Sequence, residues 1–328
     1  MSAPELSRAD ALRLAAGAAL PLAATPAHAA DDADQPSSWP DSVRRSLRHP
    51  SLKDRPVIVT GGNRGFGWFM ARELLAAGAK VAITGRNVEA LKTAAARAER
   101  IAGPGKCLTI VADVTRPADC ERTIGETLAA FGRFDVLINN AGVSSLTLGG
   151  SIGLQGNRVT PFHEASIENG RAVIETNLLG VFYMTKAAMP HFVGRKFGKV
   201  FSISTSLGNM VRPGNSFYGA SKAGLEVFHR VWAAELKGTG IDVNILLPGG
   251  ASDTEFIPDS AVPGAVGSRA GRLLPGDVIV PPAVWLSTDA TNGVTGERII
   301  AKQWDNAAAP DIAFKGCLQP HVAEPAIM

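Results

Sequence analysis

The chain has 328 residues, of which 45% are apolar and 19% charged, and its length allows one large domain or two ordinary ones. A net charge of +3, with no basic run or arginine-rich arm, gives no reason to expect a nucleic-acid partner. The three cysteines, Cys107, Cys120 and Cys317, show neither a metal-ligand spacing nor a CxxC pair. We therefore predict no metal site, and free thiols that pack as small hydrophobes.

The first 55 residues differ from the rest of the chain. Residues 1–30 are typical of an export leader or of an Ala-rich disordered tail: Arg8 precedes a soft apolar stretch that ends at a small-residue cleavage site. The stretch is too short and too interrupted by proline to predict a membrane span. It resembles a twin-arginine leader, but Ala9 stands where the second arginine belongs, so cytoplasmic and exported locations both stay open. Residues 31–55 have no apolar period, which predicts a linker.

From residue 56 onward, apolar β runs alternate with helical runs. The predicted strands are 56–60, 81–84, 107–111, 135–139, 199–203, 241–247 and 299–300. The predicted helices are 66–77, 88–101, 117–131, 166–191 and 216–236. Strands that are apolar throughout and separated by helices predict a parallel sheet buried on both faces, with right-handed crossovers.

We therefore predict a single three-layer α/β domain over residues 56–305, a doubly wound, Rossmann-like parallel sheet of seven strands. Residues 306–328 form a C-terminal extension in this scheme. The ligand of such a sheet lies outside the carboxyl ends of the strands.

A glycine-rich turn follows the first predicted strand directly and precedes the first predicted helix. Its pattern, T-G-x-x-x-G-x-G from Thr60, is typical of a dinucleotide site in this context. Gly61 permits the tight turn, Gly65 lets the backbone approach the pyrophosphate, and Gly67 lets helix and strand pack closely. The free N–H groups of the helix N-terminus favour the phosphates. A simple turn between strand and helix is the alternative.

The second strand indicates which dinucleotide binds. An acidic residue after it would favour NAD, but here it is followed by Arg86, and Arg64 lies in the turn. Because a guanidinium matches phosphate geometry, we predict NADP, with NAD less favoured; solvated arginines are the alternative. Asp113, after the third strand, is a candidate for the adenine amino group or for a cap of the next helix.

Tyr218 and Lys222 are four residues apart on a predicted helix and so share one face. A cation beside a tyrosine favours the phenolate, so we expect the pKa of Tyr218 to be lowered toward neutrality. Such a phenol is a proton donor and acceptor for carbonyl–alcohol chemistry. A solvated helix face is the alternative reading of the pair, and the upstream glycine turn argues against it.

Six segments in a fixed order resemble the short-chain dehydrogenase/reductase family over about residues 55–305. They are Thr60-Gly61 to Gly67, Asn139-Asn140-Ala141-Gly142, Glu175-Thr176-Asn177-Leu178, Ser202-Ile203-Ser204-Thr205-Ser206, Tyr218-Gly219-Ala220-Ser221-Lys222 and Pro248-Gly249. The resemblance implies a nicotinamide-dependent oxidoreductase that transfers a hydride between the cofactor and a carbonyl or secondary alcohol.

The resemblance also implies a catalytic tetrad. Tyr218 would be the acid/base, Lys222 would bind the nicotinamide ribose, and Asn177 would hold a water in a proton relay. The carbonyl-polarising hydroxyl falls on Thr205, where the family usually has serine. Threonine keeps the hydroxyl and adds a methyl group that stiffens χ1. Ser204 or Ser206 could replace Thr205 only if the strand end slipped in register, because the side chains of neighbouring strand residues point to opposite faces.

The cofactor-binding residues follow from the turn and from the resemblance together. The segment Asn140-Ala141-Gly142 would lie along the cofactor, and Thr254, one residue later than the usual spacing, would contact the nicotinamide amide. The full predicted set is Gly61, Asn63, Arg64, Gly65, Phe66, Gly67, Arg86, Asp113, Val114, Asn140, Ala141, Gly142, Tyr218, Lys222, Pro248, Gly249 and Thr254.

Two long connections, 143–166 and 250–276, are candidates for the walls of a substrate pocket. The side chains expected to line it are Phe162, His163, Leu207, Met210, Phe217 and Phe256. Few charges approach them, which favours a neutral, mostly apolar small-molecule ketone or alcohol. A loop histidine such as His163 is more often solvated than catalytic.

Three functions stay open at this point. The first is reduction of a carbonyl; the second is an NADP-binding sensor without turnover, favoured only by Thr205; the third is an epimerase or dehydratase that oxidises its substrate transiently. The resemblance implies a homodimer or homotetramer paired through the helices that carry Asn177 and Tyr218.

Overall fold

The computed structural model describes residues 41–144, 148, 160–257 and 273–320. Its centre is a seven-stranded sheet in the order β3-β2-β1-β4-β5-β6-β7, with every neighbouring pair parallel. The strands are β1 (Pro56–Val59), β2 (Lys80–Gly85), β3 (Cys107–Val111), β4 (Val136–Asn139), β5 (Gly198–Ile203), β6 (Ile241–Leu247) and β7 (Arg298–Ile300). The predicted fold class is thereby confirmed.

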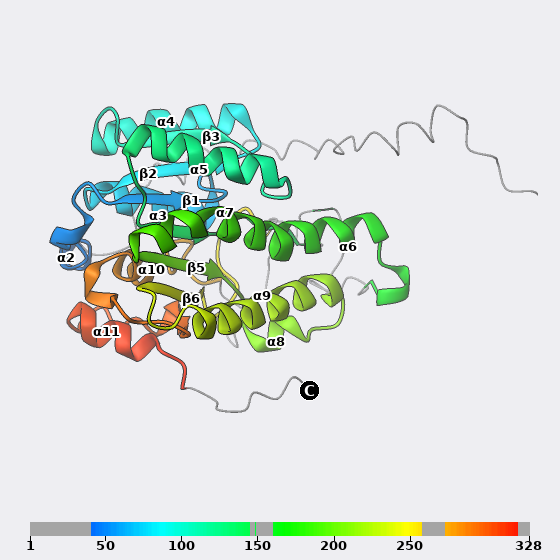
Figure 1. The fold of residues 1–328 in the computed structure, drawn as a ribbon. Coiled ribbons are helices and arrows are strands. Elements are labelled where there is room, and N and C mark those ends of the chain that lie inside the picture. Colours follow the sequence, from blue (N-terminus) through cyan, green and yellow to red (C-terminus); the bar gives the residue numbers. More distant parts are fainter. Residues whose placement is uncertain (1–40, 145–147, 149–159, 258–272, 321–328) are drawn as a thin grey trace, which may run out of the picture.

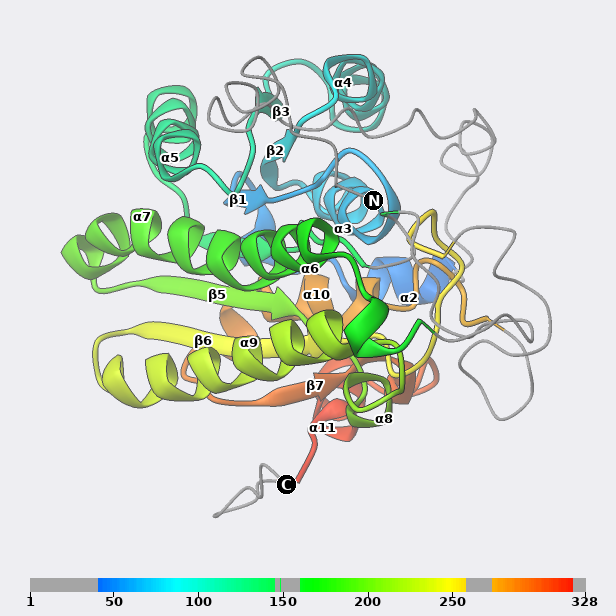
Figure 2. The same ribbon diagram turned by 90° about the vertical axis from the view of Figure 1, so that its right-hand side faces the viewer.

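Helices cover both faces of this sheet. On one face lie α3 (Gly65–Ala76), α4 (Val88–Ala102) and α10 (Val280–Leu286), and on the other α5 (Pro117–Phe131), α7 (Gly180–Arg195) and α9 (Ser216–Glu235). Figure 1 shows α7 and α9 in front of β5 and β6, and Figure 2 shows α5 on the opposite side of the upper strands from α4. Every residue of β1, β4, β5 and β6 is buried, as expected for strands covered on both faces.

The remaining elements lie around the ends of the sheet. They are α2 (Asp41–Ser46), α6 (Ile167–Ile174), α8 (Leu207–Met210), α11 (Pro310–Cys317) and the 3-10 turns Pro50–Leu52, Phe162–Glu164, Asp289–Thr291 and Ala301–Gln303. Figure 1 shows α6 and α8 toward the end at which the β5 arrow points. The carboxyl ends of the strands are therefore flanked by short helices.

The segment before β1 corrects the predicted linker. Residues 41–52 form α2 and a 3-10 turn, and Val43, Leu47 and Leu52 are buried in the main core. The sequence shows no apolar period here because only a few scattered side chains reach the core. Residues 1–40, including the leader-like stretch, lie outside the described residues, so the location of the protein stays a prediction.

The chain after β7 is also part of the domain rather than an appendage. Phe314 and Cys317 of α11 are buried in the same core, and Leu318 forms a bridge with Ile299 in β7. The predicted boundary at residue 305 therefore falls inside one folded unit, and the described part of the extension covers one edge of the sheet.

The predicted helix over 166–191 is interrupted. After α6, residues Glu175–Leu179 form one π-helical turn before α7 continues to Arg195. A π turn inserts one extra residue into a helix and is frequently found at functional sites. Asn177 lies in this turn and is fully buried. Period-based reasoning does not detect such an insertion, since both flanking segments keep an ordinary helical pattern.

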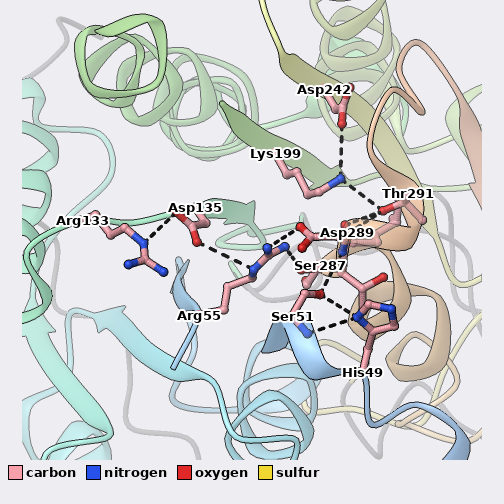
Figure 3. A network of polar contacts seen from close by, with 12 residues as sticks. His49, Ser51, Arg55, Arg133, Asp135, Lys199, Asp242, Ser287, Asp289 and Thr291 are labelled. Carbon is pink, nitrogen blue, oxygen red and sulfur yellow. Dashed lines mark hydrogen bonds and ion pairs between the residues drawn. The ribbon is translucent and has the colours of Figure 1, made fainter. Parts of the chain in front are cut away.

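A polar network ties together the amino ends of the strands. Arg55, just before β1, donates to the Ser287 carbonyl oxygen at 2.9 Å and is paired with Asp289 and, at 3.7 Å, with Asp135 (Figure 3). Lys199 of β5 lies 3.2 Å from Asp242 of β6. All these charges are paired, all but Asp289 are buried, and they lie at the opposite end of the strands from the glycine-rich turn. We therefore interpret them as structural.

None of the helices in the described part of the chain has the length and apolar character that a membrane span requires. Within the same residues, no cluster of three or more His, Cys, Asp or Glu side chains is arranged to hold a metal ion.

Candidate active site

The glycine-rich turn brings β1, α3 and the end of β4 into close contact. Gly61 has φ +63°, a backbone conformation that favours glycine, and a Cβ added there would lie 3.1 Å from the Cα of Ala141. A Cβ on Gly67 would lie 2.2 Å from the carbonyl oxygen of Gly61. A side chain at either position would therefore collide with neighbouring backbone atoms, which explains why the tight turn and the close packing of helix and strand both require glycine.

The turn fits a pyrophosphate. No side chain caps the first turn of α3, whose N–H groups are left for another acceptor. A Cβ added to Gly65 would meet only the Thr254 Cβ, at 3.8 Å, among the described residues within 4 Å. The backbone of the turn is thus open on this side. Phe66, in contrast, packs its side chain against the main core, so only its backbone faces the turn.

Replacement of Gly67 by alanine tests this geometry. We expect Gly67→Ala to distort the turn, because the new methyl group meets the Gly61 oxygen and the Asn140 side chain at 2.2 and 2.5 Å. Overpacking of this kind costs about 1–3 kcal/mol, which is about a 5- to 150-fold loss of NADPH affinity if it falls on the bound form. Fluorescence titration of NADPH measures it. Gly125→Ala on α5 is the control, since nothing lies within 4 Å of that site; equal affinities of the two variants would refute the argument.

Hydrogen bonds hold the end of β4 against the glycine turn. The Asn140 Nδ2 donates to the carbonyl oxygens of Thr60 and Gly61 at 2.9 and 3.1 Å. The backbone N–H groups of Asn140 and Ala141 both donate to the Thr60 Oγ1 at 3.0 Å. Asn139 instead bonds Thr185 on α7 and serves the packing of the sheet. Segment 140–142 therefore lies beside the turn, as the family resemblance implies.

The predicted phosphate-binding arginines also lie near the carboxyl ends of the strands, but each is paired with a carboxylate. Arg64 lies 3.2 Å from Glu255, and Arg86 lies 3.8 Å from Asp113. Both arginine side chains are about half exposed, and exposed ion pairs of this kind are weak. The alternative of fully solvated arginines therefore does not describe this structure, and a weak ion pair leaves each guanidinium able to exchange its carboxylate for a phosphate.

The neighbouring cofactor candidates are placed as follows. Asp113 accepts from the Thr115 backbone N–H at 3.0 Å and closes a turn, whereas Arg116 occupies the N-cap of α5, so the predicted helix cap is wrong. Val114 is buried against Gly180 at the start of α7. Asn63 lies against Gly85 at the end of β2. These contacts bring the ends of β1, β2 and β3 to one surface.

The segment after β6 closes over the turn from the other side. Gly249 has φ +91°, and Pro248 accepts from the Lys302 N–H at 3.0 Å. Thr254 lies beside Gly65, despite the one-residue shift in spacing noted in the sequence. Residues 258–272 of the long connection 250–276 lie outside the described residues.

The chemical end of the site is built on Tyr218 and Thr205. Tyr218 is 8% exposed on α9, and the hydroxyl of Thr205, at the end of β5, lies close enough to its phenol to act on the pKa of Tyr218 as a hydrogen-bond donor. Asn209 Nδ2 donates to the Thr205 Oγ1 at 2.9 Å. Ser204 points elsewhere, donating to Glu226 at 2.7 Å. The structure therefore brings Thr205, not its neighbour, to the tyrosine.

The pKa of Tyr218 differs from the sequence-based expectation, and burial shifts the pKa of Lys222 as well. Burial raises the pKa of Tyr218 to about 12, and the bond from Thr205 only partly opposes it. Burial likewise lowers the pKa of Lys222 to about 8, against the negative charge of Glu226. The Lys222 Nζ lies 5.9 Å from the Tyr218 ring centroid and donates to the Ile203 carbonyl oxygen at 2.7 Å. The predicted lowering of the tyrosine pKa by lysine is wrong, because desolvation of the buried phenol dominates.

Asn177 joins α6–α7 to the loop after β4. Its Oδ1 accepts from the Val143 N–H and its Nδ2 donates to the Val143 carbonyl oxygen, both at 2.8 Å. The same Nδ2 donates to the Ser221 Oγ, one residue before Lys222, at 3.3 Å. The amide therefore holds the loop against the helix that carries Tyr218 and Lys222.

The predicted pocket residues divide into two groups. Phe217 and Phe256 pack with Val143, Val173 and Tyr218, and the Phe256 ring centroid lies 6.0 Å from that of Tyr218. Met210 is half-buried on α8. Phe162, His163 and Leu207 are exposed and lie outside this apolar cluster. His163 lies 3.8 Å from Glu164.

Known proteins of similar sequence and structure identify the family to which this site belongs. The family model described as short chain dehydrogenase covers residues 55–260. The chain belongs to the short-chain dehydrogenase/reductase family. Among relatives, 11-beta-hydroxysteroid dehydrogenase 1A of Arabidopsis thaliana is 31% identical over 71% of the chain, which spans 61% of that longer protein.

Two bacterial relatives are covered almost completely. The 3-oxoacyl-(acyl-carrier-protein) reductase FabG of Salmonella typhimurium is 31% identical over 76% of this chain and 96% of its own length. The solved 3-ketoacyl-(acyl-carrier-protein) reductase of Brucella melitensis, complexed with NADH, is 25% identical with a TM-score of 0.62, and covers 76% of this chain and 96% of its own. Family membership and the Rossmann-like fold are thus shown.

Proposed function

We propose that this protein is an NADP-dependent oxidoreductase that interconverts a carbonyl and a secondary alcohol of a neutral, mostly apolar small molecule. The observation that carries the proposal is the placement of the buried Tyr218 phenol beside the buried Thr205 hydroxyl, at the carboxyl ends of the strands, where the glycine-rich turn also lies. Two hydroxyls at one point are suited to bind a carbonyl oxygen. Family membership supports the same reaction class.

The protonation states suit the reductive direction. A phenol with its pKa raised to about 12 is protonated at neutral pH and can donate. When bound, the nicotinamide supplies the hydride to the carbonyl carbon. Thr205 polarises the carbonyl oxygen, and the Tyr218 proton passes to that oxygen as negative charge develops on it. Because an alkoxide is a stronger base than a phenolate, this transfer is downhill.

Lys222 and Asn177 support this step in the proposal. Lys222 holds the ribose, and its charge stabilises the phenolate left on Tyr218. Asn177 takes part in a proton relay through a water, and its bonds to Val143 and Ser221 keep it beside α9. The epimerase or dehydratase alternative uses the same groups, so product analysis with catalytic amounts of cofactor distinguishes it.

The cofactor preference rests on Arg86. We expect Arg86→Ala to weaken NADPH binding by about 10- to 100-fold, the value of one charge-assisted contact, and to change NADH binding by less than about threefold. Parallel titrations with both cofactors measure this. Lys92→Ala, which removes an exposed ion pair with Glu89 on α4, is the control. If both cofactors weaken by the same factor, Arg86 does not read the 2′-phosphate.

The substrate class follows from the surroundings of Tyr218. Phe217, Phe256 and Val173 present apolar surface beside the phenol. The decisive experiment is NADPH oxidation measured with a panel of neutral ketones and, in parallel, with oxo acids. Turnover of the neutral ketones is the expected result. Tight NADPH binding without turnover of any carbonyl would favour the sensor function instead.

We also propose that the protein forms a homodimer or homotetramer. Val227 and Val231 of α9 are exposed, and the Phe228 and Trp232 rings stack at 5.2 Å on the same helix. Phe182 of α7 extends this aromatic group, with its ring centroid 6.1 Å from that of Phe228. The full or partial exposure of these apolar side chains on α9 and α7, which a second copy would cover, supports the proposal.

A further inference from the structure

A partly buried ion pair, formed by residues outside the predicted tetrad, lies next to it. Arg298, the first residue of β7, donates through Nε to both carboxylate oxygens of Glu226 on α9, at 3.1 and 3.0 Å. Both side chains are at most one-fifth exposed. Glu226 follows Lys222 by one helical turn. No motif of the sequence marks Arg298, which lies 93 residues from Thr205 along the chain.

Together with Lys222, this pair forms hydrogen bonds to three consecutive residues at the end of β5. Lys222 donates to the Ile203 carbonyl oxygen at 2.7 Å, Ser204 donates to Glu226 at 2.7 Å, and Arg298 Nη2 donates to the Thr205 carbonyl oxygen at 2.8 Å. Residues 203–205 are therefore fixed one after another. The direction of the Thr205 hydroxyl depends on this backbone, since χ1 of threonine is stiff.

Arg298 is itself fixed by the end of the described chain. Its Nη1 donates to the Gln319 Oε1, and the Gln319 N–H donates to the Arg298 carbonyl oxygen at 2.9 Å. The planar guanidinium thus contacts a carboxylate, a backbone carbonyl and a side-chain amide with separate N–H groups. Lysine cannot reproduce this arrangement, because its ammonium is a single point of charge.

We infer that Glu226 and Arg298 are positioning residues that hold the Thr205 hydroxyl against Tyr218. This inference rests on the proposed function, since the tyrosine–threonine pair is its proposed acid and carbonyl-binding group. Neither residue touches the reacting atoms. They act through the backbone of residues 204–205, and the C-terminal segment contributes through Gln319.

The test uses Arg298→Met and Arg298→Lys in the full-length protein. We expect kcat to fall by about 10- to 100-fold in both, as for a misplacement of about 1 Å, with the NADPH dissociation constant within about twofold of wild type. The matched control is Arg195→Met. Arg195 also bridges a carboxylate and a backbone carbonyl oxygen, those of Asp135 at 2.6 Å and Phe134 at 2.9 Å, but at the amino ends of the strands, away from the candidate active site. A merely structural Arg298 would lower the melting temperature as the control does and leave kcat unchanged.

A second measurement does not need turnover. The chain has two tyrosines, so a Tyr183→Phe background leaves Tyr218 alone, and isotope-labelled tyrosine then reports its Cζ resonance. We expect Arg298→Met to shift this resonance through loss of the Thr205 bond, and Arg195→Met to leave it in place. If the wild type reduces no carbonyl, the proposed function fails and the resonance alone decides this inference. A Cζ resonance unmoved by Arg298→Met overturns it in either case.

Discussion

Tyr218→Phe is expected to lower kcat by about 10²–10⁴-fold, the usual contribution of a positioned general acid. The variant keeps the aromatic ring, which packs with Val143, Val173 and Phe256, so the fold should survive. It removes only the hydroxyl that is bonded to Thr205. NADPH consumption with any ketone that the wild type reduces measures the loss.

The control for this experiment is the other tyrosine of the chain. Tyr183 is half-buried on α7, and Tyr183→Phe should keep the activity of the wild type. NADPH should bind Tyr218→Phe with nearly unchanged affinity, because the phenol acts on the substrate oxygen. More than one-tenth of the wild-type kcat in Tyr218→Phe would remove Tyr218 from the role of acid.

Acidification is expected to destabilise the protein through His229. This side chain is 2% exposed on α9, and its Nδ1 hydrogen is donated to the Leu225 carbonyl oxygen at 2.9 Å. Nε2 is buried and has no hydrogen-bond partner among the described residues. Burial, helped by the charge of Lys222, lowers the pKa of His229 from 6.5 to about 4.

The direction of the pH dependence follows from proton counting. Between pH 4 and pH 6.5 the unfolded chain binds a proton at residue 229 that the folded chain does not. The free energy of unfolding therefore rises with pH across this window. The contribution of His229 to this rise is about 3 kcal/mol, and the same amount is lost when the pH falls. Urea unfolding at the two ends of the window measures the change.

The matched variants isolate this histidine from the carboxylates that titrate nearby. His229→Leu should reduce the acid sensitivity by about 3 kcal/mol relative to wild type, because no buried ring remains to be charged. His163→Gln, at an exposed loop position, should unfold with the pH dependence of the wild type. Equal slopes for wild type and His229→Leu would show that the imidazole is not kept neutral by burial.

Local sequence patterns were sufficient to predict the strands, the sheet type and the glycine-rich turn. The β-branched runs, the glycine turn and the Tyr218–Lys222 spacing each depend on neighbours within a few residues, so their structural meaning is visible in the sequence. The seven parallel strands lie where the apolar runs predict them. Patterns failed where a few scattered contacts decide the structure, as at Val43 in the supposed linker.

The chemistry of the site was decided by contacts between distant segments. Sequence alone placed a cation four residues from a phenol and so predicted a lowered tyrosine pKa. The folded protein buries both groups, and desolvation raises the pKa of Tyr218 while it lowers that of Lys222. Arg298 reaches Thr205 only because β7 and β5 lie on either side of β6 in the folded sheet. Identity and spacing of residues are properties of the chain, whereas desolvation and long-range hydrogen bonds exist only once it has folded.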